Sequence, residues 1–564
     1  MRWPAFRDDA ILFEDEDLLV VDKPAGIPSQ AARPERPDDL VTRLKAHLGA
    51  REGRAPDRIY LGVHQRLDRD TSGTLLFTKR PEANPSIAKQ FEKRSLKKRY
   101  LAAVERWPSD RRSVTLDDLL AKGEGGRMEV VPKRAKNGQR AITHVRVRTR
   151  NGSRALLDVT LETGRTHQAR VQLAHARAPI AGDPIYGGPP APRLLLHASA
   201  IELEHPRTGK RLVVESKTPS EMETWLARGD LGASVFDDDT ALDRALALAM
   251  ERRWGLAQDD GTTAFRLVNE EGDALPGLAV DVYGDHLVAQ LYVSEEWNET
   301  RRTRVLDRLH ALGFAGVYLK LRPKQANVLV DTRRDDLAPA LPVRGEPAPN
   351  ELLVQEEGVP FAVRLGDGLS TGIFLDQRQN RLFVRETARG FSVANLFAYT
   401  CAFSIVAAKG GATRTVSVDA SMAALERGRH GFGVAGLELG PAHTFVAEDA
   451  FSWLARMAGK KERFDLVILD PPSYSSTKKR RFVAESDYDE LVELAAKIVS
   501  PRGRIVACCN HRGLSRNKLR RLVGQGIRAA GRDAAQIKDL PETSDFPPAP
   551  GREPNMKSVL ATLR

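Results

Sequence analysis

Apolar positions in the first two-fifths of the chain come in short runs with the alternation typical of β-strands, interrupted by a few stretches of helical spacing such as residues 40–48. The strand-like runs cover residues 18–21, 73–78, 100–104 and 156–161. Strands and helices mixed without a regular order are typical of an α+β domain. We expect this domain to cover residues 1–228.

The next segment, residues 229–240, is rich in Gly, Ser and Asp and shows no apolar periodicity, which predicts a linker. Between residues 241 and 365, strand-like runs surround one helical stretch near residues 303–312. This pattern predicts a small α+β middle module.

Strict alternation of apolar strands and helices begins near residue 391 and continues to the end of the chain. Strands that are separated by helices predict a parallel sheet covered on both faces, as in Rossmann-like α/β domains. We place this domain at residues 366–564 and expect ligands at the carboxyl ends of its strands. The chain is therefore predicted to be a multidomain protein.

Charge and cysteine content narrow the class of protein. The net charge is +12 and the isoelectric point is 9.6, which favours a polyanionic partner such as nucleic acid. Three cysteines in 564 residues make a disulfide framework or a cysteine zinc site implausible and fit a reducing, cytoplasmic location. The acidic start and the lack of a run of about 18 apolar residues predict neither secretion nor a membrane-spanning segment.

The first candidate site lies in residues 62–77, where Asp68 and Asp70 sit in a Thr-Ser-Gly turn that leads into a strand. Such an aspartate is usually a turn or capping residue. The segment nevertheless resembles the signature of the RluA family of pseudouridine synthases. Four more stretches resemble this family's blocks in the right order, within residues 11–30, 96–104, 163–187 and 193–212.

The resemblance implies that Asp68 is the catalytic aspartate of an enzyme that needs no cofactor. It further implies that Tyr100 stacks on a flipped base and that Arg165 is the cation that pairs with the carboxylate. Breaking the glycosidic bond of uridine and rejoining uracil through carbon 5 needs an ionised carboxylate as nucleophile or base. Because the synthase pattern starts at about residue 11, we do not expect the S4 RNA-binding module that often opens this family.

The second candidate site combines three acids at the ends of successive predicted strands, Asp419, Asp449 and Asp470. One such acid alone is commonly a helix cap, but several in register indicate a nucleoside site. Asp470 opens the sequence Asp-Pro-Pro-Ser-Tyr, which resembles the motif of methyltransferases that act on nitrogen atoms of bases. The second-strand acid Asp419 is the expected acceptor for ribose hydroxyls.

Residues 245–564 resemble the RlmI and RlmK group of ribosomal RNA methyltransferases, whose catalytic domain is a class I fold that uses S-adenosylmethionine. The resemblance implies that the cofactor is bound by Asn395, Phe397, Tyr399, Thr400, Asp419, Asp449, Ala450 and Asp470. It also implies that Asp470, Pro471 and Pro472 take part in the chemistry. One departure is Cys401, which replaces the glycine of the cofactor loop and could crowd the cofactor.

The atom that is methylated depends on the last part of the site. Methylation of carbon 5 of a pyrimidine needs a cysteine nucleophile, whereas guanine N7 has a lone pair and needs only positioning. Asn510 occupies the place of the catalytic cysteine, which favours guanine N7. Cys509 is the adjacent residue, so cytosine-C5 methylation stays open as an alternative.

These features together predict a bifunctional enzyme that isomerises uridine and methylates a base, with guanine N7 as the first choice. The expected partner is RNA, specifically ribosomal RNA, and neither DNA nor a membrane is expected. The basic runs at residues 97–99 and 478–481 adjoin the two sites and suggest phosphate contacts. Two rivals are a chain in which only the synthase is active and a non-catalytic ribosome-assembly factor.

Overall fold

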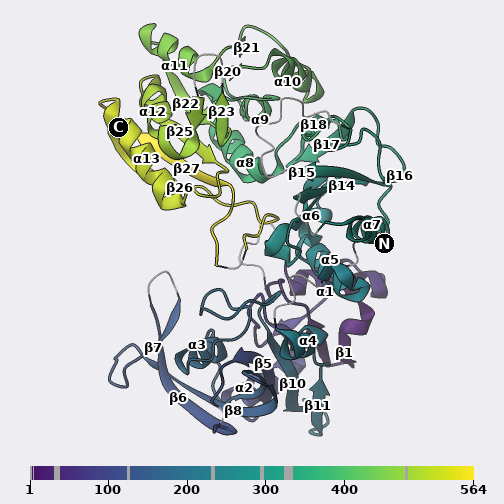
Figure 1. Cartoon of the computed structure of the whole chain (residues 1–564). Coiled ribbons are helices and arrows are strands. Elements are labelled where there is room, and N and C mark those ends of the chain that lie inside the picture. The colour runs from purple at the N-terminus through teal and green to yellow at the C-terminus, as the bar shows by residue number, and fades with distance from the viewer. Residues whose placement is uncertain are drawn as a thin grey trace. The chain divides into compact units, whose positions relative to one another are not determined.

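The computed structural model describes the chain except residues 1–2, 4, 31–37, 109, 124–126, 230–234, 293–296, 323–334, 477–480 and 550. The chain forms two compact units. The first comprises Met1–Gln258 with Asp273–Pro276, and the second comprises Asp259–Gly272 with Gly277–Arg564. Figure 1 shows both units, which are described separately here.

The first unit is built on a mixed sheet that contains eleven of the described strands, with the main order β1-β2-β4-β10-β5-β9-β8-β6-β7. Its strands are β1 (Ile11–Glu14), β2 (Leu18–Lys23), β3 (Gly62–Val63), β4 (Ser72–Thr78), β5 (Lys97–Glu105), β6 (Ser113–Lys122), β7 (Met128–Val131), β8 (Gln139–Asn151), β9 (Arg154–Leu161), β10 (Leu196–Glu204) and β11 (Arg211–Glu215). Its helices are α1 (Leu40–Glu52), α2 (Asn84–Glu92), α3 (Gln168–His175), α4 (Ser220–Arg228), α5 (Asp239–Arg252) and α6 (Trp254–Ala257).

Strand β5 shows how the two faces of this sheet differ. Successive side chains of a strand point to opposite faces. Tyr100 belongs to the core that α1 and α3 cover, whereas the neighbouring Leu101 belongs to a second core, under α4. Gly73 on β4 allows the close parallel approach of β10, because a Cβ atom there would lie 2.2 Å from the carbonyl oxygen of Ala198.

The second unit begins with a smaller sheet of order β12-β13-β14-β15-β16. Its elements are β12 (Ala264–Asn269), β13 (Leu278–Tyr283), β14 (His286–Tyr292), α7 (Glu299–His310), β15 (Gly316–Arg322) and β16 (Arg344–Gly345), followed by the hairpin β17 (Leu352–Glu356) and β18 (Val359–Val363). Strands β14 and β15 are parallel because helix α7 makes the crossover between them.

The remainder is a sheet of order β21-β20-β19-β22-β25-β27-β26. Among its described strands, β27 alone runs in the direction opposite to the others. Its strands are β19 (Ser392–Leu396), β20 (Arg414–Asp419), β21 (His443–Ala447), β22 (Phe464–Leu469), β25 (Val499–Cys509), β26 (Ala534–Asp539) and β27 (Lys557–Leu563), and a small hairpin adds β23 (Tyr474–Ser476) and β24 (Arg481–Val483). Its helices are α8 (Arg378–Thr387), α9 (Ala402–Lys409), α10 (Met422–Val434), α11 (Ala450–Gly459), α12 (Ala484–Ala496) and α13 (Arg516–Ala529).

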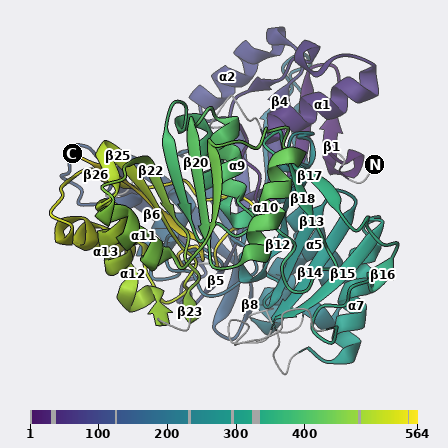
Figure 2. The same ribbon diagram turned by 90° about the horizontal axis from the view of Figure 1, so that it is seen from above.

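Helices cover both faces of this sheet, as the alternation of strands and helices predicts. Helices α11, α12 and α13 pack on one face, and α8, α9 and α10 pack on the other. Figure 2 shows α9 and α10 on one side of β20 and β22, with α11 and α12 on the opposite side. The predicted fold class, an α+β domain followed by a Rossmann-like α/β domain, is confirmed.

Contacts group helix α5 with the first unit, so the division near Gln258 falls later in the chain than the predicted linker at residues 229–240. Part of that linker, residues 230–234, lies outside the described residues. The boundaries at residues 228, 240 and 365 stay predictions. In the described part of the chain, no helix has both the length and the apolarity needed to cross a membrane.

Candidate active sites

The loop that carries Asp68 joins β3 to β4. It is held on one side by the loop after β2 and on the other by the last residue of β2. On one side, the hydroxyl of Ser29 accepts a hydrogen bond from the amide of Leu67 (3.0 Å) and donates one to its carbonyl (2.8 Å). On the other side, the carbonyl of Arg69 accepts a hydrogen bond from the buried Nζ of Lys23 (2.9 Å). Burial lowers the pKa of Lys23 to about 7. Because both neighbours of Asp68 are fixed, its carboxylate starts from a defined backbone position.

The cation that pairs with Asp68 is Arg170, and the prediction that Arg165 makes this pair is wrong. Nη1 of Arg170 lies 3.1 Å from Oδ2 of Asp68, while its Nε and Nη2 bind both oxygens of buried Asp183 at 2.8 and 2.9 Å. Burial opposes the charge of Arg170, but the carboxylates of Asp183 and Asp68 raise its pKa. Nε of Arg165 instead donates to the carbonyl of Arg140 (3.3 Å).

The reason for the correction lies in where helix α3 begins. Arg165 precedes the helix, whereas Arg170 lies in its first turn, and His167 at the N-cap has a left-handed backbone with φ of 54°. His167 is also near the aspartate, with Nε2 at 3.8 Å from Oδ2 of Asp68. Burial lowers the pKa of His167, so the neutral imidazole is favoured beside Arg170.

Asp68 and Arg165 line a cavity of about 840 Å³, together with His64, His167 and Lys98. Tyr100 lies beneath it as part of the core, with 6% of its surface exposed. Burial, and after it the charge of Asp68, raise the pKa of Tyr100. The tyrosine is therefore a neutral phenol close to the carboxylate, and its predicted contact with a flipped base stays a prediction.

In the second unit, Asp419 ends β20 and its carboxylate is oriented by backbone amides. Oδ2 accepts a hydrogen bond from the amide of Tyr399 and Oδ1 accepts one from the amide of Ser421, both at 2.8 Å. A carboxylate has further lone pairs, and these can accept the two hydroxyls of a ribose. The donor set therefore fits the nucleoside part of S-adenosylmethionine at the place that the strand order favours.

The loop that carries Tyr399 has an unusual backbone, with left-handed φ at Phe397 (58°), Tyr399 (48°) and Cys401 (61°). Such conformations cost roughly 1–3 kcal/mol each in residues other than glycine. The thiol of Cys401 is completely buried against α10, where a Cβ atom at Gly428 would lie 2.3 Å from Sγ. The side chain that was expected to crowd the cofactor is accommodated by the glycine of this helix.

The other predicted cofactor residues lie around the same strand ends. Nδ2 of buried Asn395 donates to the hydroxyl of Ser404 (3.0 Å), and the hydroxyl of Thr400 donates to the carbonyl of Gly372 (2.6 Å). Asp449 caps α11, because its Oδ1 accepts the amide of Ser452 (3.0 Å), and the buried Ala450 is the first residue of that helix. The common reading of a strand-end acid as a helix cap therefore holds for Asp449.

Asp470 directly follows β22 and is half-buried. Burial and then the charge of Asp376 raise its pKa to about 7. Asp376 lies in a single helical turn, Leu375–Gln377, and burial raises its pKa as well. The sequence motif pointed to Asp470 but gave no sign of Asp376, which comes from a distant part of the chain. At neutral pH, the proton of Asp470 is thus easily gained and lost.

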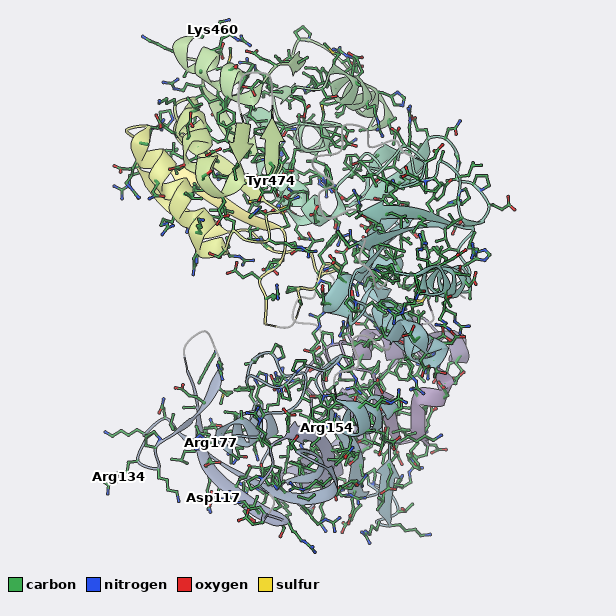
Figure 3. The ribbon with its side chains drawn as sticks, in the orientation of Figure 1. Asp117, Arg134, Arg154, Arg177, Lys460 and Tyr474 are labelled. Carbon is green, nitrogen blue, oxygen red and sulfur yellow. The ribbon has the colours of Figure 1, made fainter. Side chains whose placement is uncertain are left out.

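The residues after Asp470 join the end of β25 through side-chain contacts. The hydroxyl of Ser473 donates to Oδ1 of Asn510 (2.8 Å), and the hydroxyl of Tyr474 lies 2.9 Å from Nε2 of His511. Tyr474 is 46% exposed and projects from the β23 strand (Figure 3). Pro471 is buried and Pro472 is exposed, so the first proline of the motif packs inside the protein and the second is accessible to a ligand. An exposed aromatic ring beside hydrogen-bonding groups suits a planar base.

The two cysteines of β25 lie inside the sheet. Cys508 is completely buried and Cys509 is 1% exposed. Burial raises the pKa of both thiols. Since the thiolate is the nucleophile, neither cysteine is prepared for attack on a base.

One of the two basic runs can be located. Lys97, Lys98 and Arg99 open β5, and Lys98 lines the cavity of Asp68. The run at residues 478–481 lies outside the described residues, apart from the backbone of Arg481. Phosphate contacts by that run stay a prediction.

Comparison with known proteins agrees with both halves of this description. The family of RNA pseudouridylate synthases matches residues 17–175, and the family of S-adenosylmethionine-dependent methyltransferases matches residues 276–555. The protein YwbD of Bacillus subtilis is 35% identical over 303 residues, which cover 53% of this chain and 74% of YwbD. The ribosomal RNA large subunit methyltransferase I of Aeromonas salmonicida is 31% identical and is covered to 83%, against 57% of this chain.

A solved structure of SMU.776, a methyltransferase complexed with S-adenosylhomocysteine, is 29% identical with a TM-score of 0.52 and covers 58% of this chain and 82% of its own. Fold, sites and relatives thus define a two-domain enzyme, with an isomerase domain and a transferase domain. The chain belongs to the family of S-adenosylmethionine-dependent methyltransferases that contains these relatives, and its first unit carries an RNA pseudouridylate synthase domain.

Proposed function

We propose that the first unit converts uridine to pseudouridine in ribosomal RNA. The observation that carries this proposal is the arrangement of Asp68 between a clamped loop and Arg170 at 3.1 Å. In this reaction the bond from the ribose carbon to N1 breaks, the uracil turns, and a bond from the ribose carbon to C5 forms. C5 then loses its proton and N1 gains one, so that the product is an isomer of the substrate. Asp68 acts as nucleophile or base, and Arg170 compensates its charge while water is excluded.

The same proposal assigns methylation of a ribosomal RNA base, with guanine N7 as acceptor, to the second unit. S-adenosylmethionine, when bound, supplies an electrophilic methyl group. Asp419 holds the ribose of the cofactor, and Tyr474 with Asn510 positions the base. Guanine N7 attacks through its lone pair, so no proton leaves and the product ring is cationic. An ionised Asp470 favours that cation.

Two observations favour a nitrogen atom over a carbon atom as the methyl acceptor. Ser473 is hydrogen-bonded to Asn510, and the two neighbouring cysteines are buried, which raises the pKa of their thiols. Carbon-5 methylation would need a thiolate that reaches carbon 6 of the base. We also propose a cytoplasmic location, because all three cysteines are free and buried.

The test is a double variant, Cys508→Ala with Cys509→Ala. It should transfer tritiated methyl groups to undermodified ribosomal RNA at a rate within about tenfold of the parent. Only packing and two weak hydrogen bonds to Sγ of Cys508, from Ser558 (3.5 Å) and Asn380 (3.8 Å), are lost. Nucleoside digestion identifies the product. A fall by several orders of magnitude in a folded variant, or 5-methylcytidine as product, would overturn the assignment and make Cys509 the nucleophile.

A further inference from the structure

The face of the synthase sheet that lies opposite Tyr100 carries a row of basic side chains. Strand β8 contains His144, Arg146 and Arg148, and a bulge between Val147 and Thr149 interrupts its regular alternation. All three side chains line one hollow, and Arg146 and Arg148 both reach Asp158. The side chains of Arg146 and Arg148 are 75% and 45% exposed. Apolar Val145 and Val147 fill the intervening positions and pack against the core.

Strand register shows that this face lies opposite the core that contains Tyr100. Tyr100 is paired with Val159 and Val159 with Val145, and all three side chains belong to the core under α1 and α3. The adjacent row pairs Arg99 with Thr160 and Thr160 with His144, and it points the other way. The basic row therefore lies on the face of the sheet that is turned away from that core.

A hollow of about 750 Å³ lies over this face and is lined by residues of strands β5, β6, β8, β9 and β10. Its lining combines three arginines with hydroxyl side chains from several strands. These residues are Arg99, Arg146, Arg148, Ser113, Thr115 and Thr160. Arginine and hydroxyl groups are the usual donors to phosphate oxygens.

The hollow adjoins the catalytic cavity. His144 and Thr160 line both the hollow and the cavity that contains Asp68. A chain that leaves Asp68 past the ends of β5 and β9 therefore meets the basic row. The sequence run at residues 97–99 divides at this point, because Lys98 lines the catalytic cavity and Arg99 lines the hollow.

Charge on this face is only partly compensated. Arg146 and Arg148 share a single carboxylate, Asp158, with both distances at 2.9 Å. Two positive charges therefore face one negative charge, and the excess positive charge is available to an anionic ligand. Arg99 is paired with Glu215 at 2.8 Å, but both of these side chains are about half exposed and can separate at little cost.

We infer that RNA flanking the target uridine runs from the Asp68 cavity onto this second face, where Arg146 and Arg148 bind its phosphates. The inference rests on the proposed pseudouridine synthase activity. Asp158 holds the two guanidinium groups in place until phosphates replace it.

The experiment compares two RNA substrates with the full-length protein. One is a long ribosomal RNA fragment, and the other is a minimal stem-loop around the same uridine. The double variant Arg146→Ala with Arg148→Ala should raise the Kd and the KM for the long fragment at least tenfold and leave the minimal substrate unchanged. The slope of log Kd against log salt should fall in magnitude by about 0.7–0.9 for each arginine.

Two further variants keep the test sharp. Arg54→Ala removes an equally exposed, singly paired arginine of the same unit and should change neither substrate. Asp158→Asn removes the carboxylate that competes with phosphate and should tighten binding of the long fragment by a few-fold. A role of these charges in sheet stability alone predicts no tightening.

The outcomes separate the inference from the proposed function. Equal effects of the double variant on both RNAs, or no effect on either, would overturn the inference while the parent stays active. Absence of pseudouridine formation by the parent on every RNA would overturn the proposed function itself. Loss of folding in the double variant would show in the thermal melt, and the single variant Asp158→Asn then decides the matter.

Discussion

The two candidate catalytic carboxylates, Asp68 and Asp470, lie in opposite electrostatic surroundings. Asp68 has a guanidinium at 3.1 Å, and Arg170 is in turn fixed by Asp183. Asp470 has another carboxyl group, Asp376, as the main charged influence, and burial raises its pKa to about 7. The first arrangement suits a group that must carry negative charge throughout a reaction. The second suits a group whose charge state responds to its ligands and to pH.

The variant with the largest expected effect is Asp68→Asn, which should remove one of the two activities and leave the other. The amide keeps the shape of the side chain but cannot act as an anionic nucleophile or base, so pseudouridine formation should fall below detection. Methyl transfer should stay at the parental rate, since the second unit has its own site. Nucleoside mass analysis of the treated RNA measures both products.

The matched variant Asp70→Asn, two residues further along the same loop, should retain pseudouridine formation. Turnover by a pure Asp68→Asn protein would remove Asp68 from the chemistry.

The ion pair around Asp68 can be tested by comparing Arg170→Met with Arg165→Met. Removing Arg170 leaves the buried Asp183 without its bidentate partner, which should cost about 3–5 kcal/mol in the unfolding free energy of the first unit. Loss of the exposed Arg165 should cost about 0.5 kcal/mol or less. Urea unfolding measures both. Equal losses for the two variants would return Arg165 to the role expected from sequence.

In the second unit, Asp419→Ala should weaken S-adenosylmethionine binding by about 1.5–3 kcal/mol, the range for hydrogen bonds to a charged group. Calorimetric titration gives the Kd directly. Glu426→Ala, on the exposed side of the following helix, serves as the control and should leave the Kd unchanged. An unaltered affinity in Asp419→Ala would exclude the ribose role.

The smallest expected effect is a pH dependence of methyl transfer. The pKa of Asp470 is raised to about 7, so the carboxyl is protonated below that pH and ionised above it. If the ionised form favours the cationic product, the rate should rise up to tenfold per pH unit below about 7 and level off above it. Asp470→Asn should lack this rise. A flat profile for the parent between about pH 6 and 8 would contradict the role of the carboxylate.

Sequence alone was sufficient for the fold class, because strict alternation of strands and helices after residue 391 leaves few arrangements other than a covered parallel sheet. It also led to Asp68 and Asp470 through motifs. It led to Arg165 rather than Arg170, since both lie in one block and the correct choice depends on helix α3 beginning at Gln168. Asp376 was missed because its influence on Asp470 comes from tertiary proximity.

Because Cys401 and Gly428 are in contact, the substitutions that each position tolerates during evolution depend on the residue at the other. Any side chain at position 428 would occupy the space of the Cys401 thiol, 2.3 Å from Sγ. A glycine at position 401 would remove the two nearest atoms, Sγ at 2.3 Å and Cβ at 2.8 Å, and would leave the backbone of Thr400 at 3.1 Å as the nearest contact. Substitutions at the two positions are therefore epistatic. A lineage that enlarges residue 428 must first lose the thiol at position 401. If residue 428 is enlarged first, the intermediate protein has a clash beside its cofactor loop.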